Sequence, residues 1–558
     1  MRAKLILVIC ILLYMPCHSG VNLKNGNFYI SYTDLNTTTI EFAFDDFVRT
    51  YNSKSNEVGN FGYGWGSPWE TKLYFLPDGY IIVQEHGAGG RTAFYSDLVS
   101  EESVQLMVDL IIDAKLNNNT LSNNPTAILK RQNKLINNFE LRFAEWINLL
   151  KKNQIDYEQE LIVGLDFESN TRGNQKITIT ENGFERITIS NQKKEVFNAD
   201  GKLINLIDKN GNYTKIEYKN GFISKMICSD GNVIHLKTND DGFITEAQVN
   251  DGKKAIYKYE GKKLIYSRKA SGYQYAFEYD KNYNLTKIIY NPVRFKGEKI
   301  DAMSMTYVDK NGFIATLTDR NGDVTRYEYQ KYFNEDGTEN KDHYGTSVTK
   351  AGFNGQDVTN TYEYFIKVGA SGKRYTAQIN TKINGITTNT TYDELCSLPI
   401  HIKRGKRETN FTYNNRCKLI RKTSSFGTDV EMKYHPTSEK IVYVKNKDKE
   451  TFFEYDTNGN LTNAKTNKGE EIELVYNSEG RIIKMISTTE TLLFAYNSYG
   501  KPIEVEIDGV GKINVTYDTN GEIERVSSDD GHEMAYKVTQ AFQDLLAIVK
   551  PSGVNLGI

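Results

Sequence analysis

The feature that most limits the fold of this chain is a tyrosine that recurs every 20 or 21 residues near the C-terminal end. Each tyrosine is followed by Asp or Asn and, four residues on, by glycine; the pairs are Tyr455 and Gly459, Tyr476 and Gly480, Tyr496 and Gly500, and Tyr517 and Gly521. Steps of 21 residues lead back from Tyr455 to Tyr434, Tyr413 and Tyr392. A fixed period of this length indicates one supersecondary unit copied many times, so we expect a repeat array.

A second turn signal falls near the middle of each period, as in Asn210-Gly211 and Asp508-Gly509. Such pairs supply the positive φ angles that tight hairpin turns require. Between turns, residues 471–476 alternate polar and apolar side chains, which is the period of a strand with one buried face. The sequence therefore predicts an all-β fold, a long antiparallel strip of hairpin repeats over residues 157–540. Because a long exposed edge invites pairing, we expect the strip to curl upon itself, form a partial shell, or be capped.

Residues 1–20 have the features of a secretory signal. Arg2 and Lys4 are basic, residues 5–15 are mostly apolar, and Ser19 and Gly20 offer small residues for cleavage. That apolar run is too short to span a bilayer, and no later segment is long and apolar enough to do so. We therefore expect a protein that is secreted or held at the cell envelope, in the periplasm or on the outer surface. Lipid attachment at Cys17 is the alternative.

Residues 21–99 form a β module unlike the repeats, and residues 100–156 interrupt the strand pattern. Val104, Val108 and Ile111 share one helical face, and Pro125 opens a second stretch with apolar residues at three- and four-residue spacing. The pattern predicts a helical hairpin inserted before the strip, which either packs over an open face or end of the sheet or docks another chain. Residues 541–558 are expected to form a C-terminal tail.

The charged and metal-ligating side chains point to no catalytic chemistry. The 69 basic and 71 acidic residues give a net charge of −2, so no overall field favours nucleic acid. The seven histidines are scattered, and no zinc, P-loop or dinucleotide-binding motif occurs. We therefore expect no cofactor, no metal, no nucleic-acid partner and no enzymatic activity.

The 37 tyrosines are more than a generic core needs, and they fall mainly at the repeat positions. The simplest interpretation is packing, with one ring stacked in each repeat. An aromatic surface that binds sugars is the alternative.

Two N-terminal segments carry a family resemblance when they are taken together with the repeats. The residues concerned are Arg49, Tyr51, Asn52 and Ser53 in the first segment and Gly62, Gly64 and Trp65 in the second. The chain resembles the Rhs/YD-repeat family over residues 21–99 and 176–540. The resemblance implies an N-terminal module followed by a strip of YD repeats. Many members then cut the chain at an Asp-Pro-x-Gly segment and release a toxic domain; because no proline here follows Asp, these roles are not carried over.

These patterns favour an exported, non-catalytic YD-repeat scaffold that forms a curled β surface or partial shell at the cell envelope or outside the cell. One alternative is a module that binds glycans on an envelope or cell surface. Another is a shell component for a separately encoded toxin. The expected partners are therefore an envelope glycan or a separately encoded protein.

Cys396 and Cys417 lie one repeat apart, and both stand in place of the turn glycine. Equivalent positions one repeat apart are two strands apart, or about 9–10 Å. A disulfide needs Cα atoms within about 7 Å. The spacing therefore argues against a bond between them, unless the two turns lean together.

Overall fold

The computed structural model describes residues 19–36, 46–87, 89–170, 173–292, 301–308, 312–352, 355–369, 374–497, 500–517, 523–529 and 531–549. The expected signal up to residue 18, the repeat glycine Gly521 and residues 550–558 of the expected tail lie outside the described residues. Ser19 and Gly20, where we expect signal cleavage, begin the first described strand.

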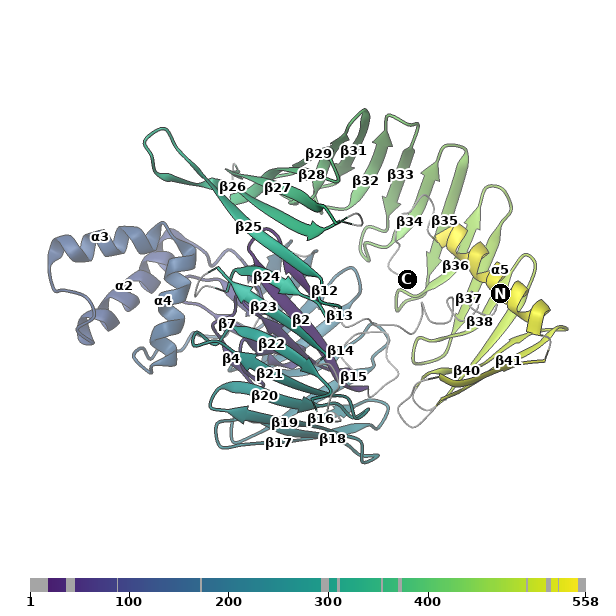
Figure 1. Cartoon of the computed structure of the whole chain (residues 1–558), viewed down its shortest axis with the longest axis horizontal. Coiled ribbons are helices and arrows are strands. Elements are labelled where there is room, and N and C mark those ends of the chain that lie inside the picture. Colours follow the sequence, from purple (N-terminus) through teal and green to yellow (C-terminus); the bar gives the residue numbers. More distant parts are fainter. Residues whose placement is uncertain are drawn as a thin grey trace.

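Most of the described chain is one antiparallel sheet of 33 strands, in which neighbours in the sheet are neighbours in sequence (Figure 1). The first third comprises β10 (Asp166–Ser169), β11 (Gln175–Thr180), β12 (Gly183–Thr188), β13 (Lys193–Asn198), β14 (Leu203–Ile207), β15 (Tyr213–Lys219), β16 (Phe222–Cys228), β17 (Val233–Thr238), β18 (Ile244–Val249), β19 (Lys254–Glu260) and β20 (Lys263–Arg268). The second comprises β21 (Gln274–Tyr279), β22 (Leu285–Tyr290), β23 (Ala302–Tyr307), β24 (Ile314–Thr318), β25 (Val324–Phe333), β26 (Glu339–Ala351), β27 (Asp357–Val368), β28 (Arg374–Ile383), β29 (Ile386–Tyr392), β30 (Pro399–Arg404) and β31 (Arg407–Tyr413). The last comprises β32 (Leu419–Ser424), β33 (Asp429–Tyr434), β34 (Ile441–Asn446), β35 (Lys449–Tyr455), β36 (Leu461–Thr466), β37 (Glu471–Tyr476), β38 (Ile482–Ser487), β39 (Thr491–Tyr496), β40 (Pro502–Ile507), β41 (Gly511–Tyr517) and β42 (Ile523–Ser528).

The predicted all-β strip of hairpin repeats is confirmed. Positive φ angles occur at the repeat glycines Gly459, Gly480 and Gly500, where an L side chain would be strained. The strip stays open, with β10 and β42 as its outer strands. Both edges have a neighbour: Tyr95 pairs with Glu168 of β10, and a C-terminal helix contacts β42. These contacts limit pairing with other chains at the ends of the sheet.

The N-terminal module consists of short strands in small sheets. Its elements are β1 (Ser19–Asn22), β2 (Asn27–Asn36), β3 (Asp46–Asn52) and β6 (Trp65–Gly66) in one sheet, β4 (Val58–Gly59) and β5 (Gly62–Tyr63) in a second, and β7 (Lys72–Phe75), β8 (Ile81–Gln84) and β9 (Arg91–Phe94) in a third, with the 3-10 helix η1 (Pro68–Glu70) between them. Figure 1 shows the first half of the strip wound around β2.

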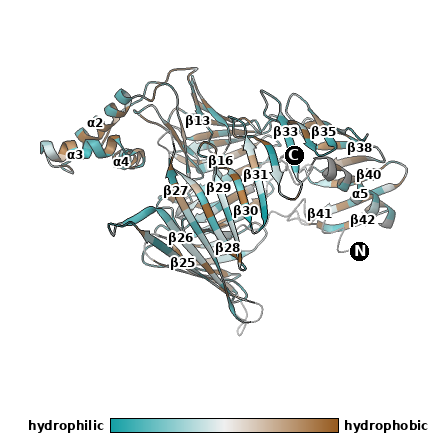
Figure 2. Ribbon diagram, turned by 90° about the horizontal axis from the view of Figure 1, so that it is seen from above, coloured by the Kyte–Doolittle hydropathy of each residue, from teal (hydrophilic) through white to brown (hydrophobic). Residues whose placement is uncertain are grey.

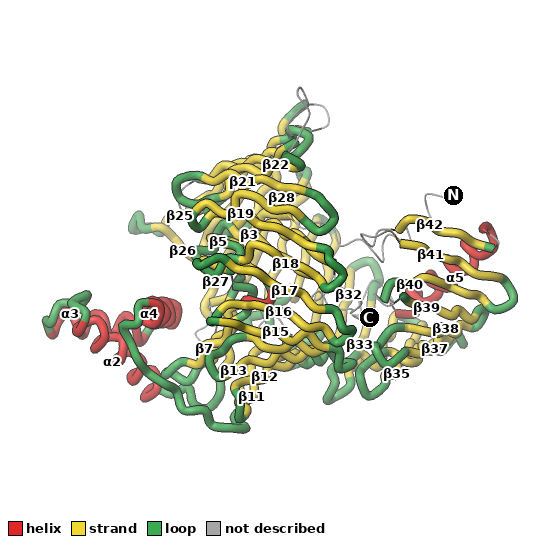
Figure 3. The backbone as a smooth tube through the Cα atoms, turned by 90° about the horizontal axis from the view of Figure 1, so that it is seen from below, coloured by secondary structure: helices red, strands yellow, loops and turns green. Residues whose placement is uncertain are grey.

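The insertion after this module contains three helices, where the sequence predicts two. They are α2 (Glu101–Asn117), α3 (Pro125–Ile136) and α4 (Phe139–Lys151). The second predicted stretch is divided because Asn137 ends α3 and the Asn138 side chain caps α4 by accepting from Leu141 N. The three helices pack on Leu76 and Ile82 of the module and lie far from the C-terminal end of the strip (Figure 3).

The chain continues after β42 as helix α5 (Gly531–Val549), where we expected the last turn of the strip and part of a tail. Met534, Val538 and Ala541 of α5 are buried. Their spacing of four and three residues is that of one helical face, and this face packs on the sheet.

Two separate hydrophobic cores lie on one face of the sheet, which we call the inner face. The first joins the N-terminal module to strip residues 167–327, and the second joins strip residues 430–515 to α5. Between Ala377 and Val430, no residue is buried, and every residue of that stretch is described. Apolar and polar segments alternate along this stretch, across β28–β31 (Figure 2). Both faces of β29–β31 are therefore left without a covering layer from the described chain.

Cys396 and Cys417 form a disulfide with their Cα atoms 5.3 Å apart, so the expectation from their spacing is wrong. The two cysteines do not stand at equivalent positions. Cys417 has the positive φ of the glycine slot, whereas in the preceding turn Ser397 has it. That turn closes from Asp393 N to Leu398 O and holds one residue more than the turn from Asn414 N to Lys418 O. The extra residue moves Cys396 within reach of Cys417.

Candidate functional site

The N-terminal module is bound to the strip at turns that follow the tyrosine position of the repeat, which we call tyrosine-side turns. Backbone hydrogen bonds across this boundary run from Leu73 N to Gly201 O (2.8 Å), from Tyr63 N to Lys262 O (2.9 Å), from Ile244 N to Asn60 O (2.9 Å) and from Ile314 N to Gly26 O (3.0 Å). Each bond involves a different hairpin of the strip. The module therefore sets the positions of several repeats at once.

Arg49 occupies the centre of this interface and is fully buried. Its Nε donates to Asp34 Oδ2 at 2.6 Å, and its Nη2 donates to Ser267 Oγ of the strip at 2.7 Å. The guanidinium lies 4.6 Å from the ring centroids of both Tyr32 and Trp65. A buried charge is tolerated only when it is paired and hydrogen-bonded, and this arrangement meets both conditions.

Tyr51 and Ser53 in the first segment also form hydrogen bonds with the strip, and Asn52 supports the local backbone. Tyr51 Oη accepts from Leu285 N at 2.9 Å, and Ser53 Oγ donates to Gly312 O at 2.8 Å. Asn52 Oδ1 accepts from the backbone N–H of Lys54 and so shapes the chain after the strand. This segment therefore acts as a row of docking groups.

The glycine and tryptophan segment completes the same interface. Trp65 Nε1 donates to Tyr279 Oη at 2.9 Å. A Cβ at Gly62 would lie 2.6 Å from Lys262 O, and one at Gly64 would lie 2.9 Å from the Tyr51 ring. Glycine is needed at both positions because of close approach and positive φ. All seven N-terminal motif residues thus lie in or beside one docking surface.

Glu70 is a half-buried residue whose carboxyl group holds the loop that contacts the strip. Its Oε1 accepts from Asn60 N, and its Oε2 accepts from Ser67 Oγ at 3.1 Å. Burial raises the pKa of Glu70 to about 7. Asn60 in turn receives the hydrogen bond from Ile244. Because Glu70 holds the loop that carries this acceptor, we expect its protonation to affect docking of the module.

We expect the stability of the first core to fall as pH rises from about 4.5 to about 7. The folded state, with the higher pKa for Glu70, binds this proton more tightly than the unfolded state, whose pKa is near 4.5. The substitution Glu70→Gln should flatten this part of the pH profile. Urea midpoints followed by tryptophan fluorescence at pH 5 and pH 7.5 measure the effect. Equal pH dependence in both proteins would rule out this role for Glu70, and Glu260→Gln, at the exposed end of β19, is the control.

The repeat tyrosines bridge neighbouring repeats through their hydroxyls. Strands β35 and β36 of one hairpin form five pairs with a bulge at Tyr455, whereas β36 and β37, which join two repeats, form only three. The tyrosine-side end of the junction is therefore splayed. Tyr476 Oη spans it and donates to Leu461 O at 2.8 Å.

The same bond recurs along the strip. It is made by Tyr218, Tyr259, Tyr279, Tyr307, Tyr329, Tyr413, Tyr434, Tyr455, Tyr496 and Tyr517, each to a carbonyl 14 to 22 residues earlier. Burial raises the pKa of Tyr434 to about 12, so its hydroxyl is a neutral donor at physiological pH. Tyr392 stands at the same bulge position. The recurrence of tyrosine follows from packing and from this hydrogen bond.

We expect Tyr476→Phe to destabilise the second core by about 1 kcal/mol, because the Leu461 carbonyl loses its donor in a half-buried site. Tyr536→Phe is the matched control, since Tyr536 of α5 is 66% exposed. Chemical denaturation of both variants measures the difference. Equal midpoints for the two variants would contradict a bridging role for the hydroxyl.

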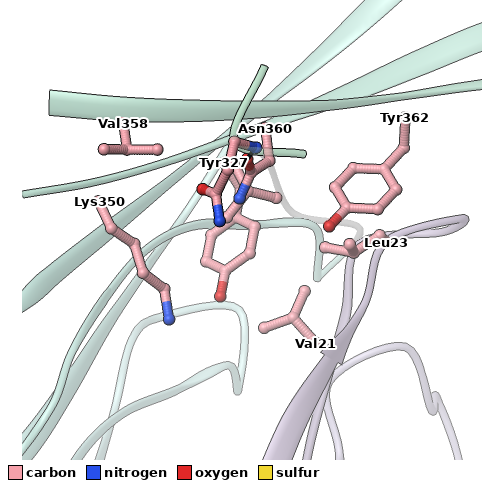
Figure 4. Close-up of a pocket in the computed structure, with 9 residues that line it drawn as sticks. Val21, Leu23, Tyr327, Lys350, Val358, Asn360 and Tyr362 are labelled. Atoms are coloured by element: carbon pink, nitrogen blue, oxygen red, sulfur yellow. Dashed lines mark hydrogen bonds between the residues drawn. The ribbon is translucent and has the colours of Figure 1, made fainter. Parts of the chain in front are cut away.

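A cavity of about 430 Å³ lies where the chain before β2 crosses the inner face of the strip (Figure 4). Its apolar lining is Val21, Leu23, Val348 and Val358, and its polar lining is Tyr327, Lys350, Asn360, Tyr362 and Asn384. The crossing is fixed by Thr346 Oγ1, which donates to Leu23 O at 2.7 Å. The cavity thus lies where the filled first half of the strip gives way to the open middle.

A buried ionic network joins Glu85, the residue after β8, to the start of the strip, and no local sequence pattern predicts it. Arg186 Nη2 donates to Glu85 Oε1 at 2.7 Å, and its Nη1 donates to Glu195 Oε2 at 2.8 Å. Gln175 Oε1 accepts from Arg186 Nε at 2.9 Å. Because Glu85 lies about a hundred residues before Arg186, only the fold brings the two together.

The described residues offer neither a metal site nor a membrane-spanning helix. Within the described ranges, no group of three or more His, Cys, Asp and Glu side chains is placed to hold a metal ion. Across those same ranges, no helix has the length and apolarity needed to cross a membrane.

The fold and the docking surface define an all-β repeat protein whose strip winds around its own N-terminal module. Residues 18–92, which span most of that module, match a protein family described as a domain of unknown function, DUF6531. A comparison with curated proteins finds no match.

Several solved structures are similar to the chain at low identity. The crystal structure of TcdB2-TccC3 without its hypervariable C-terminal region is 11% identical, with a TM-score of 0.42 over 92% of this chain and 28% of that one. The crystal structure of TcdB2-TccC3-TEV is 13% identical, with a TM-score of 0.42 over 65% and 22%. The Photorhabdus luminescens Tc holotoxin pore, with the mutation TccC3-D651A, is 12% identical, with a TM-score of 0.38 over 66% and 24%. The chain thus covers between 22% and 28% of the length of these structures.

Proposed function

We propose that the chain is an exported, non-catalytic scaffold of the Rhs/YD-repeat type, a curled β-strip that forms a partial shell and offers its inner face to another polypeptide. The observation that carries this proposal is the stretch between Ala377 and Val430, where the hydrogen-bonded ladder continues but no side chain is buried. A sheet of this length normally needs a layer against one face.

On both sides of the open stretch, the inner face of the strip is covered by another part of the chain. The first half of the strip is covered by the N-terminal module and the second by α5. On the inner face of the middle, Thr388 stands opposite Arg404, Thr390 opposite Ile402, and Ile402 opposite Thr409. This mixture of polar and apolar side chains suits a face that is exposed to solvent in the absence of a partner and is buried when a partner binds.

The motif residues support a structural role and not a catalytic one. Arg49, Tyr51, Ser53 and Trp65 are each engaged with the strip. Their polar groups are used to hold the module in place. A non-catalytic scaffold therefore accounts for all of them.

Photo-crosslinking from neighbouring positions on opposite faces tests the proposal. Thr388 lies on the inner face, and Asn389 lies on the outer face, where its Nδ2 donates to Asn380 Oδ1. A benzophenone amino acid at position 388 should crosslink the full chain to another polypeptide in the producing cells, and the same group at position 389 should not. Equal crosslinking from the two positions, or none from position 388, would contradict the proposal.

Export is tested separately. The N-terminus of the protein recovered from the periplasm or medium should lie immediately after Ser19 or Gly20. Recovery of the uncleaved chain from the cytoplasm alone would contradict export without bearing on the partner at the inner face.

A further inference from the structure

The cavity beside the N-terminal chain presents polar groups from three strands in register. Tyr327 stands opposite Val348, and Val348 stands opposite Asn360. Lys350 and Tyr362 lie two residues from Val348 and Asn360 respectively, so they face the same side of the sheet. Figure 4 shows the Tyr327 and Tyr362 hydroxyls pointing toward the segment with Val21 and Leu23.

The donors in this cavity are unused. Tyr327 is only 8% exposed, and its hydroxyl makes no hydrogen bond to another residue within the described ranges. Burial raises the pKa of Tyr327 to about 12, so the hydroxyl keeps its proton at physiological pH. Lys350 Nζ and Tyr362 Oη also have no partner among the residues that the structure describes. Lys350 is exposed and Tyr362 is half-buried, so an acceptor from a ligand would take the place of water at these donors and would also reach the Tyr327 hydroxyl.

The charge of the lining residues indicates which kind of acceptor group a ligand of this cavity would carry. Lys350 is the one charged residue in its lining, and the lining contains no carboxylate. A lysine ammonium and a phenol together form short, charge-assisted hydrogen bonds with a carboxylate. A cationic ligand would meet Lys350 without a counter-charge.

The opposite wall is aliphatic. It is formed by Val21 and Leu23 of the N-terminal chain, while Val358 of β27 lies beside its strand partner Lys350 on the sheet. The volume of about 430 Å³ is within the range of small-molecule sites. The ligand should therefore combine an anionic group with a short aliphatic part.

We propose that this cavity binds a small carboxylate that carries an aliphatic group, with Lys350 as its ion-pair partner and Tyr327 as a neutral donor. Two sources share this chemistry: a fatty acid, and the end of a peptide chain whose last residue is aliphatic. The site goes beyond the scaffold function and does not depend on a partner at the open inner face.

Calorimetric titration of the full chain tests the proposal with two matched pairs of probes. Decanoate is compared with decanol, and N-acetyl-leucine with N-acetyl-leucinamide. We expect at least one carboxylate to bind at least tenfold more tightly than its uncharged counterpart. Lys350→Met should weaken carboxylate binding at least tenfold, and Tyr327→Phe about threefold to tenfold. Lys367→Met, at an exposed position of β27 outside the cavity, should leave binding unchanged.

Each result decides a different point. Tighter binding of decanoate assigns the site to fatty acids, and tighter binding of N-acetyl-leucine assigns it to chain ends. The absence of saturable binding of either carboxylate up to about 1 mM would overturn the proposal. Equal affinity of the wild-type and Lys350→Met proteins would also overturn it. The conservative Tyr327→Phe variant keeps the test informative if Lys350→Met folds poorly.

Discussion

Replacing Arg49 by methionine is expected to destabilise the first half of the protein by about 3–5 kcal/mol. The substitution removes the only ion-pair partner that the described residues give Asp34, whose carboxylate is also fully buried. Asp34 accepts a further hydrogen bond from Tyr257 Oη at 2.9 Å, but a phenol does not neutralise its charge. A buried charge left without its counter-ion is among the largest single-residue penalties in folding.

Urea denaturation followed by tryptophan fluorescence measures this loss, because Trp65 and Trp69 belong to the first core. Arg320→Met is the matched control: Arg320 pairs with Asp301 on the surface, where a salt bridge contributes about 0–1 kcal/mol. The double variant Arg49→Met with Asp34→Asn should be more stable than Arg49→Met alone, because the unpaired charge is gone. Similar losses for Arg49→Met and Arg320→Met would refute a central role for the buried pair.

The substitution Gly201→Ala should cost more than the same change at an open turn. Both Gly201 and Gly211 have positive φ, so alanine costs about 1–2 kcal/mol at either position. A Cβ at Gly201 would also lie 1.9 Å from Leu73 O of the N-terminal module, whereas at Gly211 nothing lies within 4 Å. The clash is between a Cβ fixed by the backbone and a backbone carbonyl oxygen, neither of which can rotate away, so it adds about 1–3 kcal/mol or separates the module from the turn.

Gly312→Ala provides an independent repeat of this test, since its Cβ would lie 1.9 Å from Ser53 O. Gly322→Ala is the corresponding control, with positive φ and open space. Thermal denaturation of the four variants compares the two pairs. An equal loss of thermal stability within each pair would mean that the module is not in close contact with the tyrosine-side turns.

Local signals in the sequence were sufficient to predict the strip. The tyrosine period, the Asn-Gly and Asp-Gly turns and the alternating strands report interactions between residues close in sequence, and the observed hairpins follow them. The position of each tyrosine is explained by the bulge, which leaves a carbonyl of the preceding repeat for its hydroxyl.

The N-terminal motif could be found from the sequence, but its role could not. Arg49 and Ser267 are 218 residues apart, and Ser53 and Gly312 are 259 apart. No local pattern encodes such contacts. The disulfide was missed for a smaller reason: one extra residue before Ser397 displaces Cys396 from the position that the period assigns to it.

The C-terminal helix was missed because Asp530-Gly531 resembles the turns that precede it. The helical signal was present in the spacing of Met534, Val538 and Ala541. The helix covers the second core, as the N-terminal module covers the first. The two ends of the strip are therefore covered by different elements, and only the middle is left open.

Hydrogen exchange of the wild-type and Arg49→Met proteins, followed by mass spectrometry, is the most direct test of this division. If the N-terminal module holds the first half of the sheet as one body, Arg49→Met should speed exchange throughout β10–β25 and leave β33–β42, which pack with α5, unchanged. Faster exchange along the whole strip, or no change in β10–β25, would contradict the division into two independently filled halves.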